Sequence, residues 1–332
     1  MPSVSVIVLN YNGRQWIDGC LAGLASQQGA PLYETLLVDN GSRDDSVTFA
    51  RTKYPRVSIV DNGRNLGFAG GNNAGARHAS GEWLAFLNND TAPDSRWLSA
   101  LWDASRHHPE CGLVTSRIVF MDDSSVIDSA GDGYLRAGGA FKHGHGGRAD
   151  AYDAQREVFG ACGGAFMIRR DLFDALGGFD ERFFMVYEDV DLSYRARLRG
   201  EHVWYAADAV VRHAGSGSLG TVSRSSVFYG QRNLEWTWIK NTPHGLLLST
   251  AASHALYSLA GVLHYIRVGR GGAAIHAKWA ALRELRAVLE DRRRVQAMRT
   301  VDPDALAAMM EPRWFAAKRR EKAYVASRVN GP

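Results

Sequence analysis

Three carboxylates within four positions, Glu188, Asp189 and Asp191, form the densest group of chemically useful side chains in the sequence. They follow the apolar stretch 183–187 and open a segment whose pattern is helical to about residue 199. A helix start accounts for one of them, because an acidic residue there caps free backbone N–H groups. Like charges this close are costly unless a cation, a hydrogen-bond network or a proton-transfer role compensates. The cluster therefore predicts a catalytic base among these three carboxylates.

Polar segments follow four apolar stretches that predict strands, and in an open parallel sheet such strand ends line the ligand site. The four segments are residues 10–13, 39–42, 62–73 and 88–91. For one segment alone, turn-stabilising side chains are a sufficient explanation, but four together favour a nucleotide site. The ring of Tyr11 can stack on a base, and the Asp39 carboxylate can accept hydrogen bonds from a base or ribose. The glycines of 67–71 let the backbone approach a diphosphate closely.

We expect a metal ion where this site would hold the phosphates of the nucleotide. The sequence has no GxGxxG after the first strand and no GxxxxGK[ST], so dinucleotide and P-loop sites lose their main support. Asp90, at the end of an apolar strand, suits a hard divalent cation that also contacts phosphate oxygens. Mg²⁺ commonly takes one or two carboxylates with phosphates and water, so few ligands are needed. His213, which ends a later strand, could complete the site; a structural histidine is the alternative.

The elements that must position these residues alternate between strand and helix. Apolar runs predict strands at 4–9, 35–38, 57–60, 83–87 and 113–120. Helical patterns between them predict helices at 16–27, 44–53, 70–79 and 95–107, with Asp94 as N-cap of the last. The first, second and fourth strands are apolar almost throughout, as strands covered on both faces must be. The pattern predicts an α/β fold with a Rossmann-like, mainly parallel sheet flanked by helices.

Residues 121–160 are rich in glycine and predict a loop or hairpin excursion. Their tract 142–147, Lys-His-Gly-His-Gly-Gly, is interpreted as a flexible surface loop, with metal binding as the alternative. Order returns over 158–168. Helices are then predicted at 170–176 and 189–199, short strands at 202–205 and 210–213, and mostly helix from there to the end.

The composition of the 332 residues, 45% apolar and 22% charged, excludes a disordered chain, a collagen and a small disulfide scaffold. Three cysteines without a CxxC pair imply neither a disulfide framework nor a cysteine zinc cluster, and a reducing cytoplasm is the expected setting. No basic n-region precedes the first apolar run, so a secretory signal is not expected.

The net charge of +4 is unevenly distributed. Residues 267–332 hold 15 Lys/Arg and 7 Asp/Glu, whereas 241–266 contain none of these four residue types. The uncharged stretch predicts a buried or an interfacial helix, with a membrane span as the alternative. In a helix expected over 279–298, one face carries the apolar residues Leu282, Leu285, Val288 and Leu289 beside many arginines. We expect peripheral contact with an anionic membrane; packing on the catalytic domain, or on a second subunit of a homodimer, is the alternative.

Several of these motifs, in this order and spacing, resemble the family 2 glycosyltransferases of the GT-A fold over about residues 3–240. The motifs are residues 4–12, 38–42, 65–73, 87–90, and 178–184 with 188–192. Within the family, the chain is most similar to the bacterial rhamnosyltransferase-like branch that builds cell-surface polysaccharides. That branch also shows Tyr229, Arg232-Asn233 and a basic, helical C-terminal region. The resemblance implies a GT-A catalytic domain over 1–240, with a nucleotide-sugar half (1–120) and an acceptor half (121–240), followed by the helical region 241–332.

The resemblance also implies roles for individual residues. Asp189 would be the catalytic base beside Glu188, and Asp90 with His213 would hold Mg²⁺ or Mn²⁺ against the diphosphate. Asn88 stands where the family usually has the first Asp of its Asp-X-Asp motif. Asp191 and Arg232 are expected on the acceptor side. The expected nucleotide-binding residues are Asn10, Tyr11, Asn12, Asp39, Asn65, Gly67, Asn72, Asn88 and Asn89.

The implied reaction is an inverting, metal-dependent sugar transfer. The base draws off the proton of an acceptor hydroxyl, which attacks the anomeric carbon opposite the leaving nucleoside diphosphate. dTDP-rhamnose is the leading donor, with UDP- and GDP-sugars open, and the acceptor is a growing cell-surface polysaccharide or a lipid-linked glycan. The expected location is the cytoplasm, at the inner face of the membrane where the C-terminal region contacts it.

Other protein classes explain less of the sequence. A sugar nucleotidyltransferase would need a Gly-rich triphosphate loop with Arg or Lys after the first strand, which is not found. A catalytically inactive GT-A scaffold would not need to keep both Asp90 and Asp189. Nucleic acid is not an expected partner, because the basic surplus lies next to the uncharged stretch 241–266, a pairing that favours an anionic membrane surface.

Overall fold

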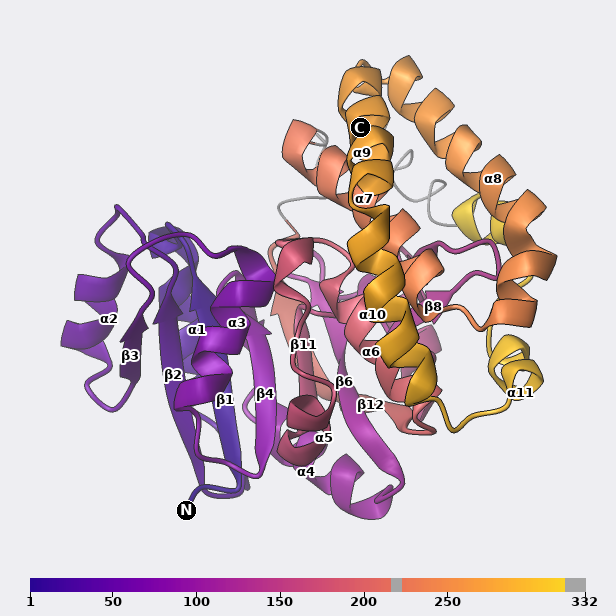
Figure 1. Cartoon of the computed structure of the whole chain (residues 1–332). Coiled ribbons are helices and arrows are strands. Elements are labelled where there is room, and N and C mark those ends of the chain that lie inside the picture. Colours follow the sequence, from indigo (N-terminus) through magenta and orange to yellow (C-terminus); the bar gives the residue numbers. More distant parts are fainter. Residues whose placement is uncertain (216–222, 320–332) are drawn as a thin grey trace.

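The computed structural model describes residues 1–215 and 223–319 and is built around one ten-stranded sheet (Figure 1). The main path of the sheet runs in the order β10 (Arg156–Glu157), β12 (His202–His213), β6 (Cys111–Phe120), β11 (Ala165–Arg169), β4 (Trp83–Asn88), β1 (Val4–Asn10), β2 (Tyr33–Asp39), β3 (Ser58–Asp61). Two short strands, β5 (Thr91–Pro93) and β7 (Ile127–Ser129), pair with β12 and β6. Strands β3, β2, β1 and β4 pair in parallel, as do β6 and β12, whereas β11 is antiparallel to both its neighbours. The predicted mainly parallel α/β sheet is confirmed.

The central strands are apolar on both faces because helices cover both faces. Alternate residues of β1 enter two different cores, Ile7 on one face and Val6 with Val8 on the other. The helices of the first half are α1 (Arg14–Ala25), α2 (Ser46–Lys53), α3 (Gly67–His78) and α4 (Trp97–His107). They follow β1, β2, β3 and β5 in turn, as βαβ connections require, so the carboxyl ends of β1, β2 and β4 lie together at one edge.

The first five predicted strands and four helices are all present, with shifts of a few residues. The predicted N-cap of α4 is wrong: Arg96 occupies that position, and the Asp94 carboxylate instead forms an ion pair with Arg212 at 3.5 Å. The two short strands predicted near 202–205 and 210–213 form one strand, β12, which is interrupted by a bulge between Ala206 and Val210.

The 121–160 excursion contains the predicted hairpin, formed by β8 (Asp132–Tyr134) and β9 (Ala140–Lys142). The interpretation of 142–147 as a loose surface loop is wrong for its polar side chains. Lys142 Nζ donates to Asp128 at 2.8 Å, and His145 Nδ1 contacts the Asp128 carbonyl oxygen at 2.8 Å. A buried carboxylate therefore turns this tract inward.

The second half contributes α5 (Arg170–Ala175) and α6 (Glu188–Leu198), and the C-terminal region is helical as expected, with α7 (Arg224–Asn241), α8 (His244–Arg267), α9 (Gly271–Arg283), α10 (Leu285–Ala297) and α11 (Pro303–Ala308). The single helix predicted over 279–298 is two, because the chain leaves helical geometry at Glu284. Val288 of α10 packs with Phe183 and Trp236 of the catalytic half, so its side chain is not on the exposed face with Leu282. The domain boundary predicted at residue 240 stays a prediction, and part of the C-terminal region, residues 320–332, lies outside the described residues.

Candidate active site

The predicted nucleotide-binding residues at the ends of β1, β2 and β4 are joined by side-chain hydrogen bonds. Asn10 Nδ2 donates to Asp39 Oδ1 at 3.3 Å, and Asn89 Nδ2 donates to Asn10 Oδ1 at 2.9 Å. Asn10 and Asp39 are buried. The strand ends therefore form one connected polar floor, as parallel topology predicts.

The roles predicted for Tyr11, Asn12 and Asp39 differ in how much of each side chain is available to a ligand. Tyr11 is 49% exposed, as stacking on a base requires. Asp39 Oδ2 accepts from the backbone N–H groups of Gly41 and Ser42, and Asn12 Oδ1 accepts from the N–H of Arg43. These bonds shape the turn after β2, and a nucleotide contact by these residues stays a prediction.

The segment 65–72 is shaped by its own polar residues and by Phe184. Asn65 Oδ1 accepts from the Gly67 N–H, and Asn72, which is 2% exposed, donates to the Phe68 carbonyl oxygen. Gly67 has φ +74°, and a Cβ there would lie 2.4 Å from the Phe184 carbonyl oxygen. Only glycine satisfies both constraints. A nucleotide contact by Asn65, Gly67 or Asn72 stays a prediction; the observed bonds of Asn65 and Asn72 shape this segment, and Gly67 leaves room for the Phe184 carbonyl oxygen.

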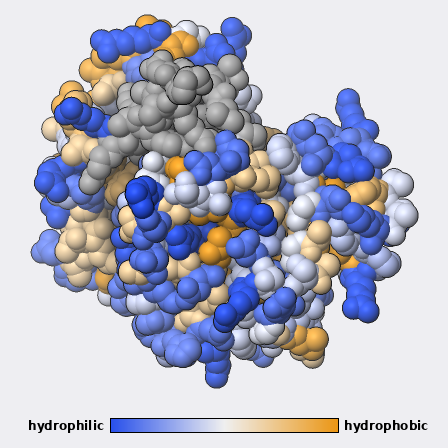
Figure 2. Space-filling model, turned by 180° about the vertical axis from the view of Figure 1, so that it is seen from behind, coloured by the Kyte–Doolittle hydropathy of each residue, from blue (hydrophilic) through white to orange (hydrophobic). Residues whose placement is uncertain are grey.

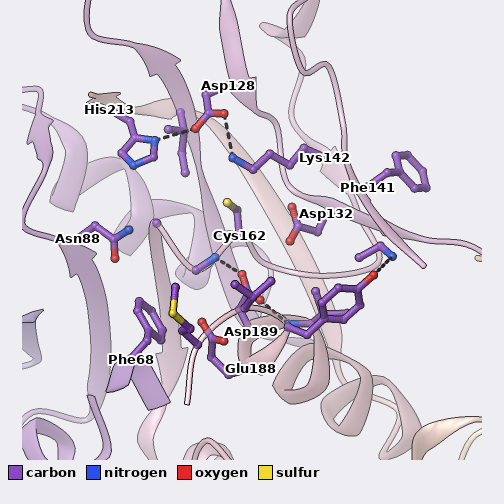
Figure 3. A pocket seen from close by; sticks show the side chains of 18 of the residues that line it. Phe68, Asn88, Asp128, Asp132, Phe141, Lys142, Cys162, Glu188, Asp189 and His213 are labelled. Carbon is purple, nitrogen blue, oxygen red and sulfur yellow. Dashed lines mark hydrogen bonds and ion pairs between the residues drawn. The ribbon is translucent and has the colours of Figure 1, made fainter. Parts of the chain in front are cut away.

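A cavity of about 670 Å³ lies between the ends of the strands and the start of α6 (Figure 3). Figure 3 shows Asn88 and His213 on one wall, Glu188 and Asp189 on another, and Lys142 on the hairpin side. The pocket thus brings together one predicted nucleotide-binding residue, the predicted metal-ligating histidine and both predicted catalytic carboxylates. Lys142, Asp128 and Phe141 also line it, although no pattern in the sequence selects them as site residues.

Glu188 and Asp189 occupy the first turn of α6, where free backbone N–H groups favour negative charge. Asp189 Oδ2 accepts from the Gly163 N–H at 2.7 Å, and its side chain remains partly exposed. Burial raises the pKa of the Asp189 carboxyl, and burial together with the adjacent Asp189 carboxylate raises the pKa of Glu188 well above its usual range. A carboxylate with a raised pKa that faces a pocket is suited to take up a proton.

The backbone leading into α6 is strained. Phe184, Val186 and Tyr187 have φ values of +63°, +67° and +77°, a region that β-branched and aromatic residues rarely adopt. Asn233 of α7, which is fully buried, holds this segment by donating from Nδ2 to the carbonyl oxygens of Phe183, Met185 and Val186 at 2.9, 3.0 and 2.7 Å. Because this strained backbone leads directly to Glu188 and Asp189, we infer that it positions the two carboxylates in the pocket.

His213 is the centre of a second polar chain in the pocket. Its Nδ1 contacts Asp128 Oδ2 at 2.8 Å, and its Nε2 lies 3.3 Å from Asp90 Oδ1, because β5 and β12 pair at this point. Burial opposes the charged imidazole, but the hydrogen bonds to Asp128 and Asp90 outweigh it and raise the pKa of His213 to about 9. The predicted neighbours Asp90 and His213 are therefore brought into contact.

This arrangement fits a divalent metal. A carboxylate and a neutral imidazole nitrogen are ligands that Mn²⁺ accepts, so a cation held by Asp90 and His213 would take the place of the proton on His213 Nε2. Asp128 holds the other ring nitrogen, as carboxylates do behind many metal-bound histidines. Asp132, Cys162 and Asp189 also place three potential ligand atoms within 4.8 Å of one another. Burial raises the pKa of the Cys162 thiol to about 12, so its thiolate would be hard to form, and the pair Asp90 and His213 remains the better candidate for Mg²⁺ or Mn²⁺.

Two predicted acceptor-side residues do not reach the pocket. Asp191 is fully buried and bonded to Arg195 at 2.8 Å, Lys240 at 2.7 Å and Asn241 at 2.9 Å. Arg232 donates to the Phe183 carbonyl oxygen and lies 4.0 Å from the ring centroid of Trp236. Both predictions are corrected: these charged groups are used inside the fold, where they support α6 and the strained segment.

Comparison with known proteins identifies the family of this chain. Residues 5–177 match the family described as Glycosyl transferase family 2. The chain is 30% identical over 239 residues to the N-acetylglucosaminyl-diphospho-decaprenol L-rhamnosyltransferase of Mycobacterium tuberculosis, covering 65% of this chain and 77% of the relative.

Among solved structures, the chain is similar to a mannosyltransferase from Pyrobaculum calidifontis in complex with GDP-Man and Mn²⁺, with a TM-score of 0.53 at 18% identity over 96% of this chain and 87% of the other. It is also similar to S. aureus TarS 1–349 in complex with UDP, with a TM-score of 0.54 at 16% identity over 99% and 92% of the two chains. These likenesses show the GT-A fold. Since the family match spans more than half of its residues, the chain belongs to the family 2 glycosyltransferases.

Proposed function

We propose that the protein is an inverting glycosyltransferase that moves a sugar from a nucleoside diphosphate to a hydroxyl group, with Asp189 as the base. The observation that carries the proposal is that Asn88, His213 and Asp189 line one pocket, with Asp90 in contact with His213. Asp189 takes the acceptor proton while the acceptor oxygen bonds to the anomeric carbon. The bond from that carbon to the diphosphate breaks, and the configuration inverts in a single displacement.

Asp90 and His213 would hold the divalent metal, Mg²⁺ or Mn²⁺. When bound, it would neutralise the charge that develops on the leaving diphosphate. Asp128 fixes the orientation of the His213 ring, and Tyr11 with Asp39 would receive the base and ribose. The Mn²⁺ in the mannosyltransferase neighbour supports a metal in the same fold.

The proposal also extends to the identity of the donor sugar, its nucleotide and the acceptor. The name of the mycobacterial relative supports rhamnose as the transferred sugar, and its diphospho-decaprenol substrate supports a lipid-linked glycan or growing polysaccharide as acceptor. We propose dTDP as the leading carrier of the rhamnose. UDP and GDP-Man in the solved neighbours keep UDP- and GDP-sugars as alternatives. We place the reaction in the cytoplasm, where the three buried cysteines stay reduced as free thiols.

The test is a panel of dTDP-, UDP- and GDP-sugars with Mg²⁺ or Mn²⁺, in which nucleoside diphosphate release is measured with and without a glycan acceptor. We expect nucleoside diphosphate to be released from sugar nucleotides of one nucleobase only, and only when the metal is present. Asp90→Ala should abolish release and metal-dependent donor binding without loss of the fold, because the carboxylate lies at a strand end. Asp103→Ala, on the exposed side of α4, is the matched control and should behave as the parent.

Release at the parental rate by Asp90→Ala with added Mn²⁺ would remove Asp90 as the metal ligand. Binding of a nucleotide-sugar without turnover of any donor would instead favour an inactive scaffold.

A further inference from the structure

Helix α8 exposes an apolar stripe along most of its length. Leu248, Leu256, Leu259, Leu263 and Ile266 are 63%, 57%, 55%, 49% and 51% exposed. At 3.6 residues per turn they lie within roughly 80° of one another around the helix. The prediction of a buried helix over 241–266 is therefore wrong, because only 11% of its most apolar window is buried.

The opposite side of α8 is polar and bound to the protein. His254 Nε2 contacts Glu235 of α7 at 2.7 Å, its Nδ1 contacts the Ala137 carbonyl oxygen at 2.9 Å, and its ring stacks on Trp238 with centroids 3.7 Å apart. Ser258 donates to the same Glu235 at 2.8 Å. By length and composition α8 could cross a membrane, but a span would break these bonds and expose buried polar groups to lipid. The helix is therefore built to lie along a surface.

Charge around the stripe has one sign. Residues 241–283, which include all of α8 and α9, contain four cations, at Arg267, Arg270, Lys278 and Arg283, and no carboxylate. Ile275, Trp279 and Leu282 continue the apolar surface on α9, at 46%, 63% and 61% exposed. Figure 2 shows apolar and charged residues side by side at the upper edge of the molecule, where α8 and α9 meet (compare Figure 1).

We propose that this surface, the α8–α9 face, docks on an anionic lipid bilayer with α8 parallel to the membrane plane. The face is formed by the exposed apolar residues of α8 and α9 together with Arg267, Arg270 and Arg283. Leucines enter the acyl boundary while cations at the rim contact lipid phosphates, as amphipathic interfacial helices do. Two arginines of the helix predicted over 279–298, Arg292 and Arg294, are outside this face and bond to the Ile239 carbonyl oxygen and to Asp291.

Helix α8, which carries the face, contacts the hairpin that lines the pocket, and this deepens the proposed function, on which this step rests. The β8–β9 hairpin lines the pocket through Phe141 and Lys142, and the turn of the same hairpin bonds to α8 through Ala137. A lipid-linked acceptor could therefore keep its lipid in the bilayer under α8 while its glycan enters the pocket.

The experiment is flotation of the full chain with vesicles of phosphatidylcholine alone or mixed with phosphatidylglycerol, at about 0.05 M and about 0.5 M NaCl. We expect the protein to bind anionic vesicles at low salt and to bind them more weakly at high salt. Each cation removed from the face by substitution should weaken this binding by roughly fivefold. The double variant Leu259→Glu, Leu263→Glu should bind at least about tenfold more weakly.

The matched controls carry the same chemical change elsewhere. Leu32→Glu alters a leucine that is 69% exposed at the other end of the molecule and should bind as the parent does. Arg267→Gln with Arg270→Gln should weaken binding, whereas the exposed pair Arg51→Gln with Arg56→Gln should not. Circular dichroism verifies that each variant is folded.

Absence of the parent from anionic vesicles at low salt would overturn the proposal, as would equal binding by the leucine double variant. A dimer that this double variant converts to monomer, without vesicle binding by the parent, would show that a second copy covers the face. Flotation needs no turnover, so vesicle binding without nucleoside diphosphate release would remove the proposed function and leave the docking face intact.

Discussion

Two aspartates in the first turn of α6, on different sides of the helix, have pKa values shifted in opposite directions. On the pocket side, Asp189 is partly exposed and burial raises its pKa. Two residues further on, Asp191 is fully buried, yet Lys240 and Arg195 outweigh the effect of burial and lower its pKa. The two residues differ because, among the described residues, cations contact Asp191 and not Asp189. One of these cations, Lys240, lies far along the chain on α7, so the sequence around Asp191 does not show it.

This difference separates a structural carboxylate, Asp191, from the proposed catalytic one, Asp189. Asp191 belongs to a chain of ion pairs in which Lys240 of α7 also contacts Asp180 at 2.9 Å, and Asp180 pairs with Arg182. That chain fixes α6 against α7. Asp189 accepts hydrogen bonds from backbone N–H groups, and burial nevertheless keeps its pKa raised, as the proposed role of a base requires.

The largest expected effect is on turnover in Asp189→Asn. The amide cannot take a proton, so we expect the rate to fall by roughly 10²-fold or more, with donor affinity within a few-fold of the parent. Because a raised folded-state pKa means that ionised Asp189 costs folding free energy at neutral pH, the free energy of unfolding should not fall. Single-turnover kinetics, donor titration and urea unfolding measure the three quantities. If donor binding fails as badly as turnover, Asp189 is a binding residue and Glu188 becomes the candidate base.

Asp191→Asn should show the reverse pattern. Its removal leaves Arg195 and Lys240 buried with an incomplete partner set, so we expect the free energy of unfolding to drop by about 3 kcal/mol. In variants that remain folded at low temperature, turnover per folded molecule should stay close to that of the parent. A stability equal to that of the parent in urea denaturation would contradict the structural role given to Asp191.

Asn233→Ala tests the link between the two regions, because Asn233 holds the strained backbone that leads to Asp189. Loss of its donors leaves buried carbonyl groups unpaired, at a cost of about 1–3 kcal/mol in stability. Turnover should fall by up to roughly 10²-fold through misplacement of the base, while donor affinity is retained. Asn233→Gln, which keeps the amide, should recover part of the loss. An equal fall in donor binding and turnover would show a collapsed pocket instead of a displaced base.

The smallest effect is a shift in pH dependence. The proposed role of Asp189 requires its ionised form, and its pKa is raised, so activity should fall with decreasing pH at values above the usual Asp pKa of 3.8. Stability should respond to Asp191 in the opposite sense: its lowered pKa stabilises the fold above 3.8, and that contribution is lost as the pH falls through the lowered value. A pH–rate profile and acid unfolding curves, each repeated on the matching Asn variant, separate the two groups. An acidic limb that persists unchanged in the residual activity of Asp189→Asn would assign the limb to another group.

The sequence alone determined the α/β class, the strand order along the chain and the polar strand ends, because apolar periodicity and βαβ alternation are local patterns. It also selected Asp189, Glu188, Asp90 and His213, because carboxylates and a histidine at strand ends or helix starts are visible as motifs. It did not reveal Asp128 or Lys142, because a single Asp and a Lys in a glycine-rich tract carry no local signal until the hairpin folds over the pocket.

Only the tertiary structure decided which charges are neutralised and which surfaces stay exposed. Asp191 and Arg292 look as functional as their neighbours in the sequence, and they become structural because partners distant along the chain, Lys240 and the carbonyl groups at the end of α7, come within hydrogen-bond distance. In the sequence alone, the apolar stretch 241–266 is compatible with burial, with surface contact and with a membrane span, and the fold leaves it exposed. The physical reason is the same in each case: the cost of a buried charge and the exposure of an apolar side chain depend on what the fold packs against them, and that is set by contacts between distant residues.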